Sequence, residues 1–257
     1  MTEDPRPGVA GCARRLLQGH KYELLLAALL QHLFAAAALP NLDVYTRFVW
    51  PLNMVLLGLL SVGIFAGSSR KSRVFKNVMS AVVVAFTGLW WFATPTRGVM
   101  VALSVSYGAF FLVILFEVMR HLLRPSYIDV DLVSAAVCGC LLLLETSIFL
   151  MQALHYAVPG SFRGIDTTSA TTVYLDLVYF CSIVITSIGF GDITPAHHMT
   201  KLATSAVGLT GQMYSVVLVG ILISKYTSAT AERLRARGNG PGPEGGVARS
   251  DVDASAG

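Results

Sequence analysis

Long apolar runs alternate with short polar connections along most of the chain. The apolar runs cover residues 24–39, 48–66, 77–93, 99–119, 132–157 and 202–226. A helix needs about 20 such residues to cross the hydrocarbon core of a bilayer, and shorter ones cross when flanking side chains reach the interface. The pattern therefore predicts six transmembrane helices.

The connection 158–201 differs from the others because it is longer and contains an apolar run of its own, 173–185. That run is too short to cross a bilayer. Thr171 and Thr172 are suited to cap a helix start, and Asp176 would favour the positive end of the helix dipole in the first turn. We expect a re-entrant helix followed by non-helical, glycine-containing backbone, which is tolerated at membrane depth only where it is buried in protein or lines a water-filled path.

Composition strengthens the membrane interpretation. The chain is 54% hydrophobic and only 13% charged, far from the roughly 25% charged residues of a soluble domain. Only residues 1–20 and 227–257 are polar at length, so we expect no soluble catalytic or ligand-binding domain of ordinary size. The chain also has no paired acids, metal-ligand spacing or nucleophile with a base that would indicate an enzyme.

The distribution of basic residues predicts the orientation. With both termini inside, the outer connections hold only four of the 19 lysines and arginines, namely Arg47, Arg97, Arg163 and Lys201. Cytoplasmic connections carry an excess of such residues, so both termini are predicted to be cytoplasmic. The cluster at 70–76, with Arg70, Lys71, Arg73 and Lys76, either sets this orientation or binds anionic lipid headgroups.

The segment after the expected re-entrant helix has features of an ion-selectivity filter. It reads Thr186, Ser187, Ile188, Gly189, Phe190, Gly191 and Asp192. A dehydrated cation needs several inward-pointing carbonyl oxygens, which requires alternate residues near left-handed φ/ψ. Gly189 and Gly191 have that spacing. The hydroxyl of Ser187 would add the innermost ligand, while Ile188 and Phe190 would point outward against the filter's own helix.

This segment resembles the potassium-channel signature TVGYG, which is followed by Asp, preceded by an aromatic pair and followed by a proline. The aromatic pair corresponds to Tyr179 and Phe180, and the proline to Pro195. The resemblance covers residues 132–226. Ser for Thr, Ile for Val and Phe for Tyr each keep the oxygen or the apolar bulk, and Ser with GFG also occurs in ether-à-go-go potassium channels. The missing Tyr hydroxyl removes a hydrogen bond that helps to hold the filter's width.

The resemblance implies an all-α membrane protein with six transmembrane helices, a re-entrant pore helix and a selectivity filter. It implies a homotetramer, because one filter strand cannot close a pore. Potassium would bind at Ser187, Ile188, Gly189 and Phe190, with no organic cofactor. The expected partners are other copies of the chain and membrane lipids, with neither nucleic acid nor a soluble partner. The expected location is a plasma (cell inner) membrane.

The same resemblance divides the chain into four parts. Residues 1–21 form a cytoplasmic tail, and 22–124 form a four-helix, sensor-like domain. Residues 125–227 form the pore domain, and 228–257 are expected to be a disordered cytoplasmic tail. The fourth span, 99–119, has no lysine or arginine, and voltage sensing requires several such charges along one helix. Steep voltage dependence is therefore not expected.

Several residues around the filter have two possible roles. Asp192 would form an acidic ring at the outer mouth or a structural hydrogen bond behind the filter. In many similar channels a pore-helix acid pairs with this Asp, but Ile183 stands at that position. Glu145 lies inside the fifth span, where a charge needs a partner, and we expect it to tie that helix to the pore or to the sixth helix.

The sixth span contains candidate gating residues. Gly211 falls where similar channels bend their inner helix, so it is either a hinge or a close-packing position. Gln212 and Ser215 are candidate polar groups of a cavity. Val219 and Ile223, four apart on one face, would either narrow the inner mouth or pack in the core.

The sequence favours a potassium-selective channel that conducts passively. Two alternatives remain open from the residues. One is a weakly selective cation channel, which a sodium-to-potassium reversal potential would distinguish. The other is a non-conducting membrane scaffold or regulatory subunit that keeps the pore fold.

Overall fold

The computed structural model describes residues 21–38, 44–64, 78, 81, 82, 85, 88, 96–123 and 130–238. The predicted third span, 77–93, lies largely outside these residues. The basic cluster at 70–76 and the two terminal segments, 1–20 and 239–257, lie wholly outside them.

Helices account for nearly all the described structure, in agreement with the apolar runs. The helices are α2 (Lys21–Ala38), the π-helical turn η1 (Tyr45–Val49), α4 (Trp50–Ile64), α6 (Arg97–Leu122), α7 (Val130–Ala157), α8 (Ala170–Ile185) and α9 (His198–Gly238). Two short strands, β1 (Phe162–Arg163) and β2 (Thr194–Pro195), flank α8 and the segment that follows it. The predicted helices over the first, second, fourth, fifth and sixth apolar runs are therefore confirmed as helices.

Length and apolarity support membrane crossing for three of the described helices. These are Arg97–Leu122, Leu132–Ala157 and His198–Ile221, within α6, α7 and α9. The apolar parts of α2, of η1 with α4, and of α8 are shorter, at 10–17 residues each. The described residues thus support three spanning helices by this measure. The shortness of α8 agrees with the prediction that it enters the membrane without crossing it.

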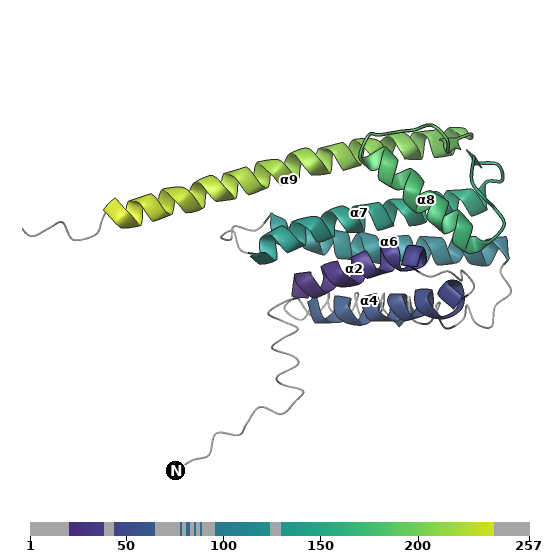
Figure 1. Ribbon diagram of the computed structural model, residues 1–257, viewed down its shortest axis with the longest axis horizontal. Coiled ribbons are helices and arrows are strands. Elements are labelled where there is room, and N and C mark those ends of the chain that lie inside the picture. Colours follow the sequence, from purple (N-terminus) through teal and green to yellow (C-terminus); the bar gives the residue numbers. More distant parts are fainter. Residues whose placement is uncertain are drawn as a thin grey trace, which may run out of the picture.

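The helices pack in layers (Figure 1). α6 and α7 form the middle layer, with α2 and α4 on one side and α9 on the other; α8 is inclined between α9 and α7. An aromatic core joins α6 to α7, where the rings of Phe111 and Phe149 stack with centroids 5.6 Å apart. Tyr107 packs against the same Phe149 ring. α8 and α9 therefore pack against a well-packed helical layer.

α9 continues well past the predicted end of the sixth span and projects beyond the other helices (Figure 1). The predicted disordered tail, 228–257, is therefore wrong for its first part, because the helix runs to Gly238. The physical reason is local. Residues 229–237 are mostly Ala, Arg, Glu and Leu, which favour helix, and the glycine- and proline-rich run begins only at Gly238.

Candidate functional site

A capping box begins α8, the helix that the sequence predicts to be re-entrant. Ser169 is the N-cap; its hydroxyl accepts from the Thr172 amide at 3.1 Å, and the Thr172 hydroxyl accepts from the Ser169 amide at 3.1 Å. The prediction that Thr171 and Thr172 cap the helix was thus wrong in position, because the cap lies at Ser169. Asp176 lies in the second turn rather than the first. Its carboxylate instead accepts from the Asp166 amide at 2.7 Å and holds the preceding loop.

The two ends of the loop around α8 are joined to each other. β1 and β2 pair antiparallel, with Phe162 opposite Pro195 and Arg163 opposite Thr194. Next to this pair, the carbonyl oxygen of Ser161 accepts from the Ala196 amide at 2.8 Å and from the Thr200 hydroxyl at 2.9 Å. The segment between α8 and α9 is therefore held at its outer end by several hydrogen bonds.

Between these anchors lie residues 186–192, which we call the filter segment. Their backbone alternates in conformation. Ser187, Gly189 and Gly191 have φ of 60°, 56° and 82°. The left-handed conformation predicted for Gly189 and Gly191 is confirmed. Ser187 is the only non-glycine residue with positive φ among the described residues, and this conformation was not predicted from the sequence. Three left-handed residues, each two apart, turn successive carbonyls toward one side of the strand.

Amides of the filter segment point back to the end of α8. The Ser187 amide donates to the Val184 carbonyl at 3.1 Å, and the amides of Ile188 and Gly189 both donate to the Ile183 carbonyl, at 2.9 and 3.2 Å. Ile183 therefore contributes its main chain at the position where similar channels place an acid. Because the amides are used on the helix side, the carbonyl oxygens of this stretch are left to face the other side.

Aromatic residues of α8 support the outer half of the filter segment. Tyr179 and Phe190 lie parallel, with ring centroids 6.5 Å apart and planes 6° apart, so Phe190 does meet its own helix as predicted. Phe180 is buried against Phe162 of β1. Ile188 is 56% exposed in the single chain, and its predicted contact with α8 stays a prediction.

Asp192, at the outer end, accepts a hydrogen bond of 2.7 Å from the Tyr179 hydroxyl to its Oδ2 atom. The structural hydrogen bond considered for Asp192 is thus present, and its partner is Tyr179. This hydroxyl is the main cause that holds the pKa of the Asp192 carboxyl below its ordinary value. Gly164 lies so close to the Asp192 carbonyl that a side chain at Gly164 would overlap it.

We expect Tyr179→Phe to move the acid sensitivity of ion conduction to a higher external pH. Phe keeps the ring against Phe190 but removes the donor, so the pKa of Asp192 rises toward its ordinary value. An ionised Asp192 concentrates cations at the mouth at low ionic strength, and protonation removes that effect. Conductance should therefore begin to fall at a higher external pH than in the wild type.

A pH titration of single-channel current measures this shift. Asp192→Asn, which cannot titrate, is the control. An unchanged titration in Tyr179→Phe would contradict the prediction.

At the inner end of the filter segment, α9 contacts it directly. The Gln212 side-chain amide nitrogen donates to the Ser187 hydroxyl at 2.6 Å. Gly211 lies against Ile185, the last residue of α8, with no room for a Cβ atom. The helix is unbroken at Gly211. Ser215 bonds back to the Gly211 carbonyl at 3.1 Å, and Val219 and Ile223 are 54% and 61% exposed in the single chain.

A second contact fixes α9 to α7, and the sequence pattern did not indicate it. The Tyr214 hydroxyl donates to the Ala136 carbonyl at 2.5 Å. It lies over Gly139, where any side chain would overlap the Tyr214 hydroxyl. A tyrosine within an apolar helix usually indicates a core or interface position. Only its partner in the fold, the Ala136 carbonyl, shows that Tyr214 joins two helices. Gly211 thus lets α9 lie against the end of α8, and Tyr214 holds α9 against α7.

Three buried polar side chains lie close together where α2, α7 and α8 meet. Glu145 of α7 and His32 of α2 are fully buried, with Oε1 and Nε2 3.7 Å apart. The same His32 nitrogen lies 3.3 Å from the Tyr174 hydroxyl of α8. The expectation that Glu145 ties its helix to the pore or to the sixth helix did not include His32 of α2, while Tyr174 of α8 does interact with Glu145. Neither His32 nor Tyr174 was identified from the sequence, since a single histidine or tyrosine in an apolar helix carries no pairing signal.

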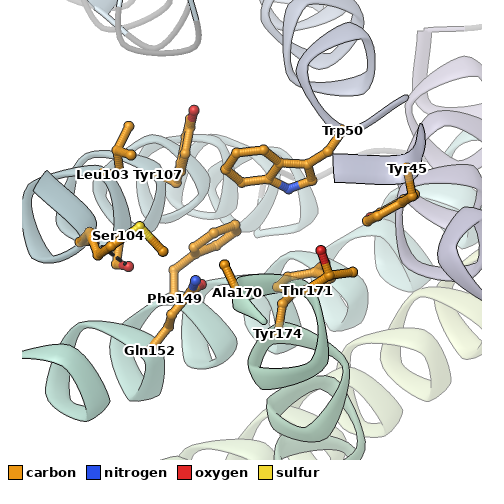
Figure 2. A pocket seen from close by; sticks show the side chains of 11 residues that line it. Tyr45, Trp50, Leu103, Ser104, Tyr107, Phe149, Gln152, Ala170, Thr171 and Tyr174 are labelled. Carbon is orange, nitrogen blue, oxygen red and sulfur yellow. Dashed lines mark hydrogen bonds between the residues drawn. The ribbon is translucent and has the colours of Figure 1, made fainter. Parts of the chain in front are cut away.

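A small cavity lies between η1, α4, α6, α7 and the first turns of α8 (Figure 2). Trp50, Tyr107, Phe149 and Tyr174 form aromatic parts of its wall. Its volume of about 30 Å³ is enough for one or two water molecules. The Tyr45 hydroxyl and the Gln152 side-chain carbonyl have no hydrogen-bond partner within the part of the chain that the structure describes, so water is the occupant that this lining suits.

The comparisons with known proteins agree with this geometry. A family model described as "Ion channel" matches residues 137–228, which include most of α7, the whole of α8, the filter segment and most of α9. The chain is similar to "Two pore potassium channel b" of Oryza sativa subsp. japonica, with 34% identity over 113 residues. It is also similar to "Two pore potassium channel c" of the same organism, with 33% identity over 90 residues.

The similarity is confined to part of each protein. It covers 44% of this chain and 27% of the first relative, and 35% of this chain and 19% of the second. The chain thus spans about a quarter or less of the length of these relatives. No solved structure matches. The resemblance to potassium channels that the sequence indicated is confirmed for the pore part, residues 137–228.

Proposed function

We propose that this chain, whose residues 137–228 are related to ion channels, is one subunit of a potassium-selective channel. The observation that carries the proposal is the backbone of the filter segment. Three left-handed residues alternate at Ser187, Gly189 and Gly191, directly after a helix too short to cross the membrane. Such a strand presents a row of carbonyl oxygens to one side, and potassium exchanges its hydration shell for such a row.

Potassium would be held by the main-chain oxygens of Ser187, Ile188, Gly189 and Phe190, with the Ser187 hydroxyl at the inner end. The Thr186 carbonyl would lie just below the Ser187 hydroxyl, toward the inner side. Asp192 would form the outer mouth, where its lowered pKa keeps it negatively charged. Tyr179 would hold the strand directly through Asp192, and Phe180 would act through Phe162 of β1, which pairs with β2.

A single strand covers one side of an ion only, so the proposal includes a homotetramer around a central axis. The exposed apolar face of α9 supports assembly. Its large exposed apolar side chains are Met199, Leu202, Leu209, Met213, Val216, Val217, Val219, Ile223 and Tyr226. In an assembled channel this face would meet other subunits and the ion path. The membrane would be the plasma membrane, with both termini cytoplasmic, as the basic residues indicate.

Opening is proposed not to depend steeply on voltage. α6 corresponds to the fourth span, and its lysine and arginine residues are Arg97 and Arg120, close to its two ends. The charge between them is Glu117. Charge moved through the membrane field supplies the gating energy of a voltage sensor, and a helix with basic residues only at its ends moves little charge.

Potassium flux into liposomes that contain the purified chain tests the proposal. We expect uptake driven by a potassium gradient, a reversal potential that follows potassium rather than sodium, block by barium, and little change in open probability with voltage. Empty liposomes are the control. A reversal potential between those of sodium and potassium would identify a weakly selective cation channel instead. Complete absence of flux would favour a non-conducting membrane scaffold or regulatory subunit.

A further inference from the structure

Among the described residues, Ser187 at the inner end of the filter segment is the only non-glycine residue with positive φ, and a side chain from another helix holds it. Ser187 has φ of 60°, which residues other than glycine rarely adopt. Its hydroxyl accepts the 2.6 Å hydrogen bond from Gln212 of α9. The two residues are separated by 25 positions in the sequence, so this contact depends on how α9 packs against α8.

The orientation of the Gln212 amide follows from its neighbours. The same nitrogen, Nε2, lies 3.5 Å from the Ile185 carbonyl oxygen, at the limit of hydrogen-bond distance. A carbonyl oxygen can only accept, so the group that faces it is the NH2. Gln212 therefore donates to Ser187, and its donor occupies one lone pair of that hydroxyl. The second lone pair of the hydroxyl stays available to a cation.

The backbone of α9 at this point is held firmly, which makes Gln212 suited to position another group. Gly211 is in contact with Ile185, and Tyr214 is bonded to the Ala136 carbonyl of α7. A side chain on such a supported turn has little freedom to leave Ser187. In contrast, the hydroxyl of nearby Thr210 bonds only within its own helix, to the Ala206 carbonyl at 2.7 Å.

From this arrangement we infer that Gln212 is a positioning residue for the innermost ion-binding oxygens, acting through Ser187. It holds the Ser187 hydroxyl in one orientation and stabilises the left-handed backbone that turns the Ser187 carbonyl toward the ion path. The inference rests on the proposed function, since it assigns Gln212 to the filter of a channel. It differs from a role for Gln212 as a polar group of a water-filled cavity, which would require no particular partner.

Barium block from the inner side is a direct probe of these oxygens. Barium and potassium have similar ionic radii, so barium enters an oxygen site sized for potassium and is held by its double charge. Gln212→Leu keeps the approximate length of the side chain but removes the donor. Loss of one hydrogen bond at each copy of the site should weaken inner barium block by about fivefold or more. Gln212→Asn, which is too short to reach Ser187, should behave in the same way.

Matched variants separate positioning from a general packing effect. Thr210→Val removes a polar group two residues away on the same helix and should leave barium block unchanged. Ser187→Ala should weaken block by itself, and Gln212→Leu added to Ser187→Ala should produce no further loss, because the partner is already gone. Equal losses from Gln212→Leu in both backgrounds would overturn the inference, as would wild-type block in Gln212→Leu.

A melting-temperature measurement, which needs no ion flux, distinguishes failure of the channel proposal from failure of the inference about Gln212. Potassium bound in the filter should raise the melting temperature of the intact protein, and Gln212→Leu should require a higher potassium concentration for half of that rise. Wild-type protein that is stabilised by potassium but passes no current would count against the proposed function, while the comparison with Gln212→Leu would still test the inference. Identical potassium dependence in the two proteins would overturn the inference alone, and absence of any potassium effect in a non-conducting wild type would overturn both.

Discussion

Gly189→Ala and Gly191→Ala are each expected to abolish potassium flux. The two residues have φ of 56° and 82°, and a left-handed conformation costs a residue with a Cβ roughly 1–2 kcal/mol. A Cβ built at either position meets no atom within 4 Å in the single chain, so the cost comes from the backbone and not from crowding. Relief of that strain would turn a carbonyl oxygen away from the ion path in every subunit. Potassium flux into liposomes measures the effect.

Gly160→Ala is the matched control for this prediction. Gly160 also has a left-handed backbone, with φ of 70°, and also has open space where a Cβ would lie. It lies in the turn after α7, outside the filter segment. The same local strain at Gly160 should leave the flux close to wild type. Wild-type flux in Gly189→Ala would contradict the filter assignment, and a similar loss in all three variants would show that left-handed strain anywhere impairs the fold.

Gly211→Ala is expected to impair conduction through packing rather than through loss of a hinge. A Cβ at Gly211 would lie 2.9 Å from Cγ2 of Ile185 and 3.2 Å from its Cα, both closer than normal contact. Overpacking of this kind typically costs about 1–3 kcal/mol. Because Ile185 directly precedes the filter segment, the displacement should reach Ser187. We expect reduced flux and a lower melting temperature.

Ile185→Leu provides the test that separates the two roles of Gly211. Leucine is not branched at Cβ, so it removes the Cγ2 methyl that an alanine at position 211 would meet. If Gly211 is a packing residue, Ile185→Leu should partly restore flux in the Gly211→Ala channel. If Gly211 is a hinge, the altered opening of Gly211→Ala should persist in the double variant. Wild-type flux and stability in Gly211→Ala would contradict both roles.

Much of α8 and of the filter segment could be predicted, because their conformation depends on interactions between residues close in the sequence. The spacing of Gly189 and Gly191 indicated left-handed residues, and the length of the apolar run 173–185 indicated a helix that does not cross a bilayer. The start of that helix was misplaced, since Ser169, Thr171 and Thr172 are all acceptable caps by residue type. Which of them caps depends on where the preceding loop arrives, and that loop is set by Asp166 and Asp176.

Contacts between distant residues could not be predicted in the same way. Gln212 was identified only as a candidate cavity residue, while its partner is Ser187. Asp192 was left with two roles, and its hydrogen bond with Tyr179 shows that at least the structural one is present. Each of these pairs joins different structural elements, so the pairing follows from the distance and rotation between those elements. A single sequence contains no direct measure of either.

By itself, the sequence determined that the chain enters a membrane, where its irregular glycine-containing segment lies, and which backbone positions there avoid the Cβ penalty. These properties depend on transfer from water to lipid and on clashes between neighbouring atoms, which involve only a few consecutive residues. The tertiary structure decided that Gln212 meets Ser187, that Gly211 meets Ile185, and that His32 lies beside Glu145. Those contacts depend on the packing of whole helices against one another, in which many weak interactions together select one arrangement.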